Sequence, residues 1–406
     1  MAHAQRHSGR GSTARSVEEH AAEVAELLEP LLTRPSETIR LDEALGRILS
    51  YDVSAPVDLP LFRNSQMDGF AVDAASLTAV PVTLPIVATV PAGPAEPAPH
   101  VPGTAVRIMT GAVLPDGADA VVPVEDTETV DDKVTIRRSR AVGDYVRERG
   151  SDVRTGTLLL SAGTELGPRH LGVLAAVGLA SVAVRTRPRV AVITTGAELV
   201  EPGAVVRPGQ IYDSNGPTLA ASLRAAGAEV AIVDRSSDEP DAFRAALRRA
   251  VARTELVVTS GGVSMGDYEV VKDVLLELGA RFGPVAMQPG GPQGLALVDE
   301  MPILTFPGNP VSTLVSFEVF LRPLLRRAAG LPPVPHAESV LDHAVTSVPG
   351  KRQFLRGRRT GSGVEVVAGP GSHLVAALAW ADVLIDVPAA VTSLAAGDRV
   401  KVWPLQ

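Results

Sequence analysis

The sequence contains no cysteine, which excludes disulfide bonds, thiolate metal sites and cysteine nucleophiles. Aromatic residues make up only 3% of the 406 residues, so the hydrophobic cores must consist mainly of aliphatic side chains. The eight histidines show none of the spacings that are typical of zinc sites. A formal net charge of −8 argues against a general nucleic-acid-binding protein, which usually carries a basic face. We therefore expect no nucleic acid partner.

Lysine and long apolar runs are also scarce. No apolar run reaches the roughly 18 residues that a membrane-spanning helix needs, so we expect no membrane partner. Residues 1–15 begin with basic residues but lack the apolar segment of a signal peptide, and we expect them to form a disordered tail of a cytoplasmic protein. Nearly all basic residues are arginine, and the lysines are Lys133, Lys272, Lys351 and Lys401.

The first half of the chain predicts two kinds of domain. Residues 16–54 and 146–187 have mixed α/β character and are interrupted by residues 55–145, where short apolar runs alternate with proline and glycine, as in a β-rich insertion. A capping box that begins at Ser16 predicts a helix over residues 16–33. The following segment, 38–53, predicts a short strand and a second helix.

The second half predicts an α/β domain and a small β domain. In residues 188–330, β-branched runs alternate with amphipathic helical segments, which predicts a doubly wound sheet with right-handed crossovers. A helix is predicted over residues 310–329, and the short runs of residues 331–406 predict a C-terminal β domain. The predicted fold class is thus a multidomain α/β protein with a central doubly wound domain, a β-rich inserted domain, a mixed N-terminal domain and a small C-terminal β domain.

Four loops follow strands of the predicted α/β domain, at residues 194–198, 236–239, 261–267 and 307–312. In open α/β sheets, ligands bind at the carboxyl ends of the strands. These loops are rich in glycine, hydroxyl and carboxylate residues. Glycine loops before helices bind anions through backbone N–H groups, and carboxylates suit Mg²⁺. The residues therefore predict a site for a phosphorylated ligand with Mg²⁺.

Each loop taken alone has an ordinary structural explanation. A glycine pair after a strand is often only a tight turn. Asp238 could cap the helix predicted at residues 240–253, and Asp267 and Glu269 could be first-turn acids that the helix dipole favours. These alternatives stay open from the sequence, although four such loops at one edge of a sheet favour a binding site.

Several ordered motifs resemble, in order and spacing, those of the molybdopterin molybdenumtransferase (MoeA) family, whose eukaryotic relatives include the gephyrin E domain. The resemblance covers nearly the whole chain from about residue 16. Its segments are NSQMDGFAV (64–72), RIMTGAVLPDGADAVVPVED (107–126), TTGAEL (194–199), GQIYDSN (209–215), SGGVSMGDY (260–268), FPGNPVS (306–312) and GPGSHL (369–374).

The resemblance implies an activity and an assembly. Such enzymes insert molybdate into adenylylated molybdopterin with the help of Mg²⁺ and release AMP. They form elongated homodimers of four-domain subunits, in which the mixed N-terminal domain serves dimerisation. The central domain resembles the partner adenylyltransferase (MogA-like), and the active cleft lies between this domain of one subunit and the β-rich second domain of the other. The adenylyltransferase and apo-molybdoenzymes are implied partners.

The resemblance also implies roles for individual residues. Arg356 is implied to bind an oxyanion, for which the guanidinium fork is well suited. The implied catalytic residues are Asp68, Thr110, Glu125, Asp152, Glu198 and Asp238. The implied metal ligands are Asp238, Asp267 and Glu269. The implied substrate-binding residues are Gly261, Gly262, Ser264, Gly266, Asp267, Gln288, Pro289, Pro307, Asn309, Pro310, Ser312, Arg356 and Ser372.

Three positions depart from the family pattern, one of which is Glu269, where members usually carry aspartate. Gln288 stands where members commonly carry a lysine, and a neutral amide makes a hydrogen bond about half as strong as a charge-assisted one. Gln66 stands where a small residue is usual. Two other functions are therefore considered. One is molybdopterin adenylyltransferase, against which the extra β domains argue. The other is a non-catalytic pterin-binding or scaffold protein, whose main support is the missing lysine.

Overall fold

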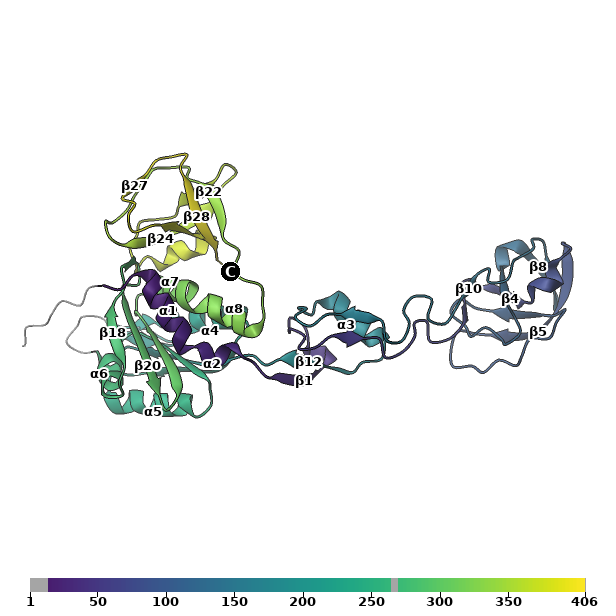
Figure 1. Cartoon of the computed structure of the whole chain (residues 1–406), viewed down its shortest axis with the longest axis horizontal. Coiled ribbons are helices and arrows are strands. Elements are labelled where there is room, and N and C mark those ends of the chain that lie inside the picture. Colours follow the sequence, from purple (N-terminus) through teal and green to yellow (C-terminus); the bar gives the residue numbers. More distant parts are fainter. Residues whose placement is uncertain (1–13, 264–268, 406) are drawn as a thin grey trace, which may run out of the picture. The chain divides into compact units, whose positions relative to one another are not determined.

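The computed structural model describes residues 14–263 and 269–405 (Figure 1). The chain divides into two compact units, Met1–Glu37 with Arg185–Gln406 (unit 1) and Thr38–Val184 (unit 2). Within the described ranges, no helix is both long enough and apolar enough to span a bilayer.

Unit 1 is built around a six-stranded sheet whose first four strands in sheet order run parallel to one another, whereas the fifth is antiparallel to the fourth and the sixth is antiparallel to the fifth. The second and third strands are almost wholly buried, as expected for central parallel strands covered on both faces. This confirms the predicted α/β class. In sheet order, the strands are β16 (Glu229–Ser236), β13 (Arg189–Thr195), β17 (Leu256–Ser260), β21 (Met301–Phe306), β20 (Pro292–Val298) and β18 (Arg281–Pro284).

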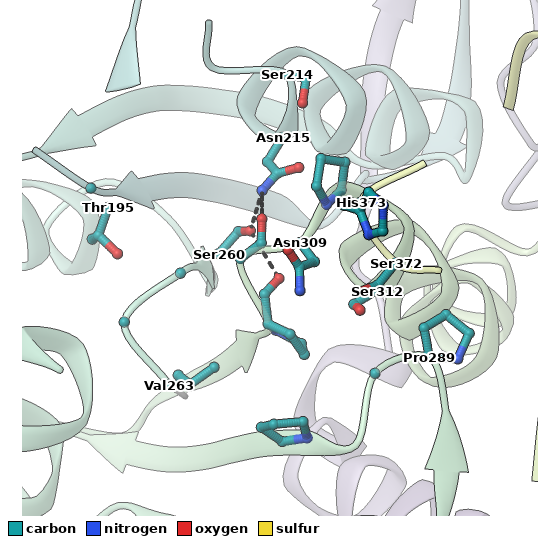
Figure 2. Close-up of a pocket in the computed structure, with 18 of the residues that line it drawn as sticks. Thr195, Ser214, Asn215, Ser260, Val263, Pro289, Asn309, Ser312, Ser372 and His373 are labelled. Carbon is teal, nitrogen blue, oxygen red and sulfur yellow. Dashed lines mark hydrogen bonds between the residues drawn. The ribbon is translucent and has the colours of Figure 1, made fainter. Parts of the chain in front are cut away.

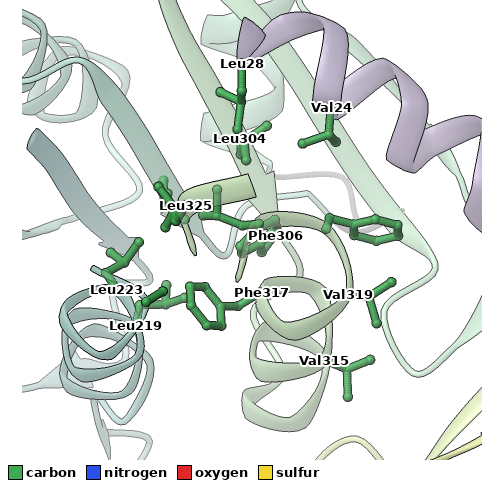
Figure 3. Packing of buried hydrophobic residues seen from close by; sticks show 14 of the residues in the cluster. Val24, Leu28, Leu219, Leu223, Leu304, Phe306, Val315, Phe317, Val319 and Leu325 are labelled. Atoms are coloured by element: carbon green, nitrogen blue, oxygen red, sulfur yellow. The ribbon is translucent and has the colours of Figure 1, made fainter. Parts of the chain in front are cut away.

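Helices cover both faces of this sheet, because successive side chains of a strand point to opposite sides. Val190 and Val192 of β13 belong to a core with α1, α4, α7 and α8 (Figure 3), whereas Ala191 and Ile193 belong to a core with α5 and α6. The domain is therefore doubly wound, as predicted. The helices are α1 (Val17–Leu27), α2 (Glu29–Leu32), α4 (Asn215–Ala225), α5 (Pro240–Val251), α6 (Val270–Glu277), α7 (Pro310–Ser316) and α8 (Arg322–Ala329).

The helix predicted over residues 310–329 is interrupted. A π-helical turn, η4 (Phe317–Leu321), separates α7 from α8. Pro323 explains the interruption, because proline has no N–H to donate to the carbonyl of Val319 and its ring crowds that carbonyl. A π turn accommodates such a lost bond without ending the helix.

The N-terminal helix differs from the prediction in its place. Residues 16–33 were expected in the mixed domain, but Val17, Val24 and Leu28 of this segment lie in the core of unit 1. Arg15 was expected in a disordered tail. Its backbone N–H instead donates to the Pro284 carbonyl, and its carbonyl accepts a hydrogen bond from the Ala286 amide. Residues 1–13 of the expected tail lie outside the described residues. The predicted capping box of α1 is present.

A second sheet of unit 1 is formed mostly by the C-terminal β domain, as predicted. The segment Met287–Gln288 (β19) precedes β20 in the chain but pairs with this second sheet. Phe354 and Trp403 join the core that contains α1, α7 and α8. In order, the strands are β19 (Met287–Gln288), β24 (Arg352–Arg359), β26 (Val383–Val387), β28 (Arg399–Pro404) and β22 (Ala337–Val340), with β25 (Val364–Val366) on β24.

Unit 2 contains the β-rich insertion as a six-stranded sheet. Its strands, in order, are β7 (Ala120–Pro123), β4 (Gly69–Val72), β6 (Ala105–Ile108), β5 (Val82–Val90), β9 (Lys133–Ile136) and β8 (Thr127–Val130). The helix predicted within residues 38–53 is wrong. The predicted short strand is present in β1 (Ser36–Arg40), but the only helical structure of the segment is a short 3₁₀ turn, η1 (Leu41–Glu43), because Gly46 has a positive φ of 69° and residues 48 and 49 form bridges to Glu165 and Val184.

The remaining elements are short. The helix after the insertion is α3 (Pro168–Ala176). The small strand pairs are β1 (Ser36–Arg40) with β12 (Ser181–Arg185), β2 (Val53–Ser54) with β11 (Leu158–Leu160), β3 (Asn64–Ser65) with β10 (Val146–Arg147), β14 (Leu199–Val200) with β15 (Ile211–Tyr212) and β23 (Val345–Thr346) with β27 (Ser393–Leu394). The 3₁₀ turns are η2 (Ala74–Leu77), η3 (Val124–Asp126) and η5 (Val375–Trp380).

His20 makes the core of unit 1 sensitive to acid. Its ring is 1% exposed and meets the Phe320 ring edge-on, with 4.6 Å between centroids. Burial, together with the positive charges of Arg15 and Arg281, lowers the pKa of His20 to about 3. Glu23 lies 3.9 Å from Nδ1, but its carboxylate accepts a hydrogen bond from Arg15. The imidazole is therefore neutral in the folded protein.

We predict that His20→Phe reduces the loss of stability in acid. An unfolded histidine has a pKa of about 6.5, so between pH 6.5 and 3 the unfolded chain binds a proton that the folded chain does not. Stability therefore falls as the pH decreases through this window, by up to about 1.4 kcal/mol per pH unit. Phe keeps a ring against Phe320 and removes this contribution. Urea unfolding at pH 7, 6, 5 and 4 measures the free energy of unfolding of both proteins. If this free energy falls equally with decreasing pH in the variant and in wild type, the prediction is wrong.

Candidate functional site

A cavity of about 870 Å³ lies in unit 1 at the carboxyl edge of β13, β17 and β21. All four loops predicted from the sequence contribute to it. Three further segments contribute to its wall: residues 211–215, residues 287–292 and a loop of the C-terminal domain at residues 370–373 (Figure 2), and Glu269 and Lys351 also line it. Because these segments are far apart in the chain, the site depends on the fold of the whole unit.

Asn215 connects the segments at the base of the cavity. Its amide Nδ2 donates to Ser260 Oγ at 3.0 Å and to the Gly308 carbonyl at 2.7 Å, as Figure 2 shows. Ser260 Oγ also lies 3.0 Å from Thr313 Oγ1, which donates to the Pro307 carbonyl at 2.6 Å. This buried network fixes the end of β17 to the loop after β21 and to the start of α4.

Asp213 has a similar structural role. Its carboxylate accepts hydrogen bonds from Thr194 Oγ1 at 2.7 Å and from the Gly216 amide at 3.0 Å. It therefore ties the end of β13 to the first turn of α4. Sequence reasoning assigned no role to Asp213 or Asn215, although both belong to the motif at residues 209–215, which was the signal for them.

The glycine pair is required by the backbone. Gly261 has a φ of +102°, and a Cβ there would lie 2.6 Å from the Thr195 carbonyl. Gly262 has a φ of +66°, and a Cβ there would lie 2.7 Å from a methyl group of Val271. The pair is thus a tight turn and also lines the cavity, so the two interpretations are compatible. The Gly261 N–H donates to the Phe306 carbonyl at 3.1 Å and is not available to an anion.

Three carboxylates line the side of the cavity formed by β13, β16 and α6. Asp238 Oδ2 accepts a hydrogen bond from the Ala197 amide at 2.8 Å. It does not cap α5, whose N-cap residue Glu239 makes no side-chain cap bond. Glu198 folds back on its own loop, and Glu269 is the N-cap residue of α6 without a side-chain cap bond. The ordinary explanation for Asp238 is therefore not what the structure shows.

The predicted metal ligands are only partly described. Asp238 and Glu269 both line the cavity, whereas Asp267 lies outside the described residues, as do the predicted ligand-binding residues Ser264 and Gly266. Among residues 14–263 and 269–405, no three histidine, aspartate or glutamate side chains gather closely enough to hold a metal ion. The metal site stays a prediction.

The opposite side of the cavity carries hydroxyl and amide groups. Ser312 of α7 and Ser372 of the C-terminal loop meet here, and the Ser372 carbonyl accepts a hydrogen bond from the Val311 amide at 3.2 Å. Gln288 lines the cavity, and its side-chain oxygen accepts a hydrogen bond from Gln353. The predicted residues Pro289, Pro307, Asn309 and Pro310 also line it.

Arg356 does not line the cavity. Its side chain is 3% exposed, and the guanidinium donates to the carbonyls of Leu374, at 2.8 Å, and Gly369. Burial lowers the pKa of Arg356 from its usual value. The expected contact with an oxyanion is therefore replaced by a positioning role, because Arg356 holds both ends of the loop that presents Ser372.

Three predicted catalytic residues lie together in unit 2. Asp68 precedes β4, Thr110 follows β6 and Glu125 follows β7, and the register of these antiparallel strands brings the three positions to one sheet edge. The Thr110 amide and hydroxyl donate to Asp68 at 2.7 and 2.8 Å, and these bonds lower the pKa of Asp68. Asp152 is exposed elsewhere in unit 2, where its amide donates to the Leu59 carbonyl.

Two cavity residues with basic side chains were missed by sequence reasoning. Lys351 lies just before β24, and His373 follows Ser372 in the C-terminal loop. The signal for His373 was its motif at residues 369–374. For Lys351 the only signal was its rarity, as one of four lysines. Ser214 and Ser260 also line the cavity without having been predicted, whereas Thr195 belongs to the predicted loop at residues 194–198.

Three family models match the chain. The model "MoeA N-terminal region (domain I and II)" matches residues 15–178, "Probable molybdopterin binding domain" matches residues 191–327, and "MoeA C-terminal region (domain IV)" matches residues 338–405. Together they span most of the chain, and the second contains the four predicted loops. The third contains Lys351, Arg356 and Ser372.

Individual proteins agree with these models. The chain is 46% identical over 406 residues to molybdopterin molybdenumtransferase 2 of Mycobacterium tuberculosis, which covers 96% of this chain and 100% of that protein. It is 40% identical over 305 residues to a molybdopterin molybdenumtransferase of Nostoc sp., covering 73% and 70%. A solved molybdopterin biosynthesis MoeA protein from Pyrococcus horikoshii has a TM-score of 0.79 and 33% identity, covering 97% and 99%.

We predict that Gly261→Ala destabilises unit 1 more than a glycine substitution without a steric clash. Gly279→Ala is the matched control, since Gly279 has a φ of +87° and open space around its Cβ position. Both variants carry a backbone strain of about 1–2 kcal/mol, and Gly261→Ala adds the contact with Thr195. Urea unfolding compares them, and equal losses of stability would show that the close approach carries no cost.

We predict that Arg356→Ala loosens the loop at residues 369–374. The variant removes two buried donors and leaves two carbonyls unpaired, at a cost of about 1–3 kcal/mol each. Hydrogen exchange of the amides at residues 371–375 should accelerate. Arg358→Ala, which removes an exposed arginine of the same strand paired with Glu365, should leave this exchange unchanged. Unchanged exchange in Arg356→Ala would contradict the positioning role.

Proposed function

Because this chain belongs to the molybdopterin molybdenumtransferase (MoeA) family and is an enzyme of molybdenum cofactor biosynthesis, we propose that it inserts molybdenum from molybdate into adenylylated molybdopterin in a Mg²⁺-dependent reaction that releases AMP. The observation that carries the proposal is the cavity at the carboxyl edge of the doubly wound sheet. Its volume of about 870 Å³ lies within the range of about 300–1,000 Å³ that is usual for small-molecule sites.

The distribution of polar groups supports a phosphorylated ligand. The carboxylates of Glu198, Asp238 and Glu269 come from the loops after β13 and β16 and from the start of α6, whereas Ser312, Ser372 and Lys351 come from α7 and the C-terminal domain. In the proposed complex, the hydroxyls of Ser312 and Ser372 donate hydrogen bonds to oxyanion oxygens. Asn309 and Gln288 offer neutral amides nearby. A ligand that carries an oxyanion and a phosphoanhydride with a bound cation fits these groups. The hydroxyl and amide groups would bind the oxyanion, and the carboxylates would lie near the cation.

The acidic side fits a magnesium ion. Mg²⁺ is usually held by only one or two carboxylates, together with phosphate oxygens and water, so a complete protein cluster is not needed. Asp238 and Glu269 would hold the ion, and the neighbouring Asp267 lies outside the described residues. When bound, the ion would neutralise charge on the phosphoanhydride.

The chain's own residues act on the water and the leaving group. Glu198 lies on the 194–198 loop, and within the described residues no hydrogen bond occupies its carboxylate. We propose that it orients the attacking water and accepts its proton as the phosphoanhydride bond breaks and AMP leaves. The cluster of Asp68, Thr110 and Glu125 in unit 2 is proposed as a second group of functional residues.

The family also supports proposals about assembly. We propose that the enzyme is a cytoplasmic homodimer, that an adenylyltransferase supplies its substrate, and that apo-molybdoenzymes receive its product. Light scattering of the purified protein would test the homodimer. The alternative of a non-catalytic scaffold rests on Gln288 alone, where a lysine was expected.

Reconstitution with adenylylated molybdopterin, Mg²⁺ and molybdate tests the activity. We expect AMP release together with active cofactor. Formation of the adenylate from ATP and molybdopterin would instead indicate the adenylyltransferase, and binding without turnover would indicate a scaffold. Asp238→Asn keeps an acceptor for the Ala197 amide but removes the charge, so AMP release should fall by about 100-fold.

The control for this variant is Asp241→Asn. Asp241 lies in the first turn of α5 with a fully exposed side chain, outside the cavity lining, and its nearest cation is Arg244 at 4.0 Å. It should retain the wild-type rate of AMP release. An Asp238→Asn enzyme as active as the control would refute a role for this carboxylate.

A further inference from the structure

The charges that line the cavity are strongly unequal. Four carboxylates face it, from Glu198, Asp213, Asp238 and Glu269. Among the described lining residues, Lys351 is the only lysine or arginine, and His373 is the only other residue with a basic side chain. An anionic group that enters the cavity therefore meets one permanent positive charge.

The other candidates for this contact are occupied or neutral. Arg356 donates to two backbone carbonyls and does not reach the lining. Gln288 is uncharged and is hydrogen-bonded to Gln353. The hydroxyls of Ser312 and Ser372 can donate to an oxyanion but cannot balance its charge.

Lys351 is held at the cavity by its backbone neighbours. Its amide donates to the Val348 carbonyl at 3.4 Å, which closes a turn, and the next amide, of Arg352, donates to the Ala286 carbonyl at 2.9 Å. The Arg352 side chain is fixed by two bonds to Asp386, at 2.8 and 2.6 Å. The turn that carries Lys351 is thus anchored on its C-terminal side.

The ammonium group itself is available. The Lys351 side chain is exposed, and within residues 14–263 and 269–405 no ion pair or hydrogen bond engages it. A lysine in this state can turn its four-carbon side chain toward a ligand without first breaking an ion pair. Lysine is also a well-established phosphate ligand, acting as a point charge.

The position of Lys351 relates it to the missing lysine. Gln288 lies opposite Gln353 in the parallel pair of β19 and β24, and Lys351 lies two residues before Gln353. The charge that was expected on β19 is therefore present at the start of the adjacent strand. Both Gln288 and Lys351 line the cavity.

We propose that Lys351 is the residue that binds the phosphate oxygens of the ligand in this cavity, in place of a lysine at position 288. The proposal rests on the proposed function, which supplies a phosphorylated pterin as the ligand. It identifies Lys351 as a substrate-binding residue of this chain and assigns Gln288 the neutral role of holding Gln353.

Equilibrium binding of molybdopterin to the full-length protein is the first test. Lys351→Ala should weaken binding by about tenfold, the usual effect of losing one charge-assisted hydrogen bond, and should reduce its dependence on salt. Lys351→Arg keeps the charge and should bind within about threefold of wild type. Because Lys351 is exposed, we expect the variants to fold, which their thermal unfolding checks.

Lys133→Ala is the matched control. Lys133 is an exposed lysine of β9 in unit 2 that does not line the cavity, so its loss changes the net charge by the same amount. Its affinity and salt dependence should equal those of wild type. If Lys351→Ala also binds as wild type does, the proposal for Lys351 is wrong while the proposed function stands.

A second measurement separates the two proposals. The chain has only four lysines, so reductive ¹³C-methylation, which keeps their charge, gives few side-chain signals, and each is assigned by substitution. Titration with inorganic pyrophosphate should shift the Lys351 signal saturably and leave the Lys133 signal in place. If wild type does not bind molybdopterin, the proposed function fails. In that case a saturable shift of the Lys351 signal with pyrophosphate still supports phosphate binding by Lys351. If the signal does not shift, the proposal for Lys351 is wrong.

Discussion

The hydrogen bonds of Asn215 hold together the parts of the chain on which the cavity depends. One side-chain amide satisfies Ser260 at the end of β17 and the Gly308 carbonyl after β21, in a position that is only 8% exposed. Without this amide the Gly308 carbonyl would lose its 2.7 Å hydrogen bond, and Ser260 Oγ would keep only its contacts with Thr313 and Pro307. The network therefore fixes the distance between the ends of β17 and β21. The cavity-lining loops that begin at these strand ends depend on this distance for their positions.

The sequence was sufficient to predict the doubly wound sheet and the four loops at its edge. The apolar runs of β13 and β17 could only be buried strands, and residues that follow parallel strands must meet at one edge. The interruption of the helix before Pro323 was also encoded locally, but it was missed because the apolar periodicity continues through it. The helix expected within residues 38–53 failed because Gly46 and two bridges favour an irregular path.

The contacts of long side chains could not be predicted in the same way. Arg356 has the chemistry of an oxyanion ligand, and only the fold shows that the carbonyls of Gly369 and Leu374 occupy it. Asp238 has the chemistry of a helix cap, yet the amide of Ala197 from a neighbouring loop binds it. In both cases the hydrogen-bond partner is distant in the chain. The residue type therefore suggested one role, and the contact made in the folded protein gives the residue another.

Backbone and charge impose different degrees of constraint on this cavity. Gly261 cannot be replaced without strain, because its φ is positive and the Thr195 carbonyl fills the space of a side chain. A positive charge is less restricted, since a long flexible side chain can reach the same point from more than one strand. The pairing of β19 with β24 places Gln288 opposite Gln353, two residues after Lys351, and both Gln288 and Lys351 line the cavity. In the proposed arrangement the glycine turn is kept, and the positive charge comes from the residue before β24 instead of from β19.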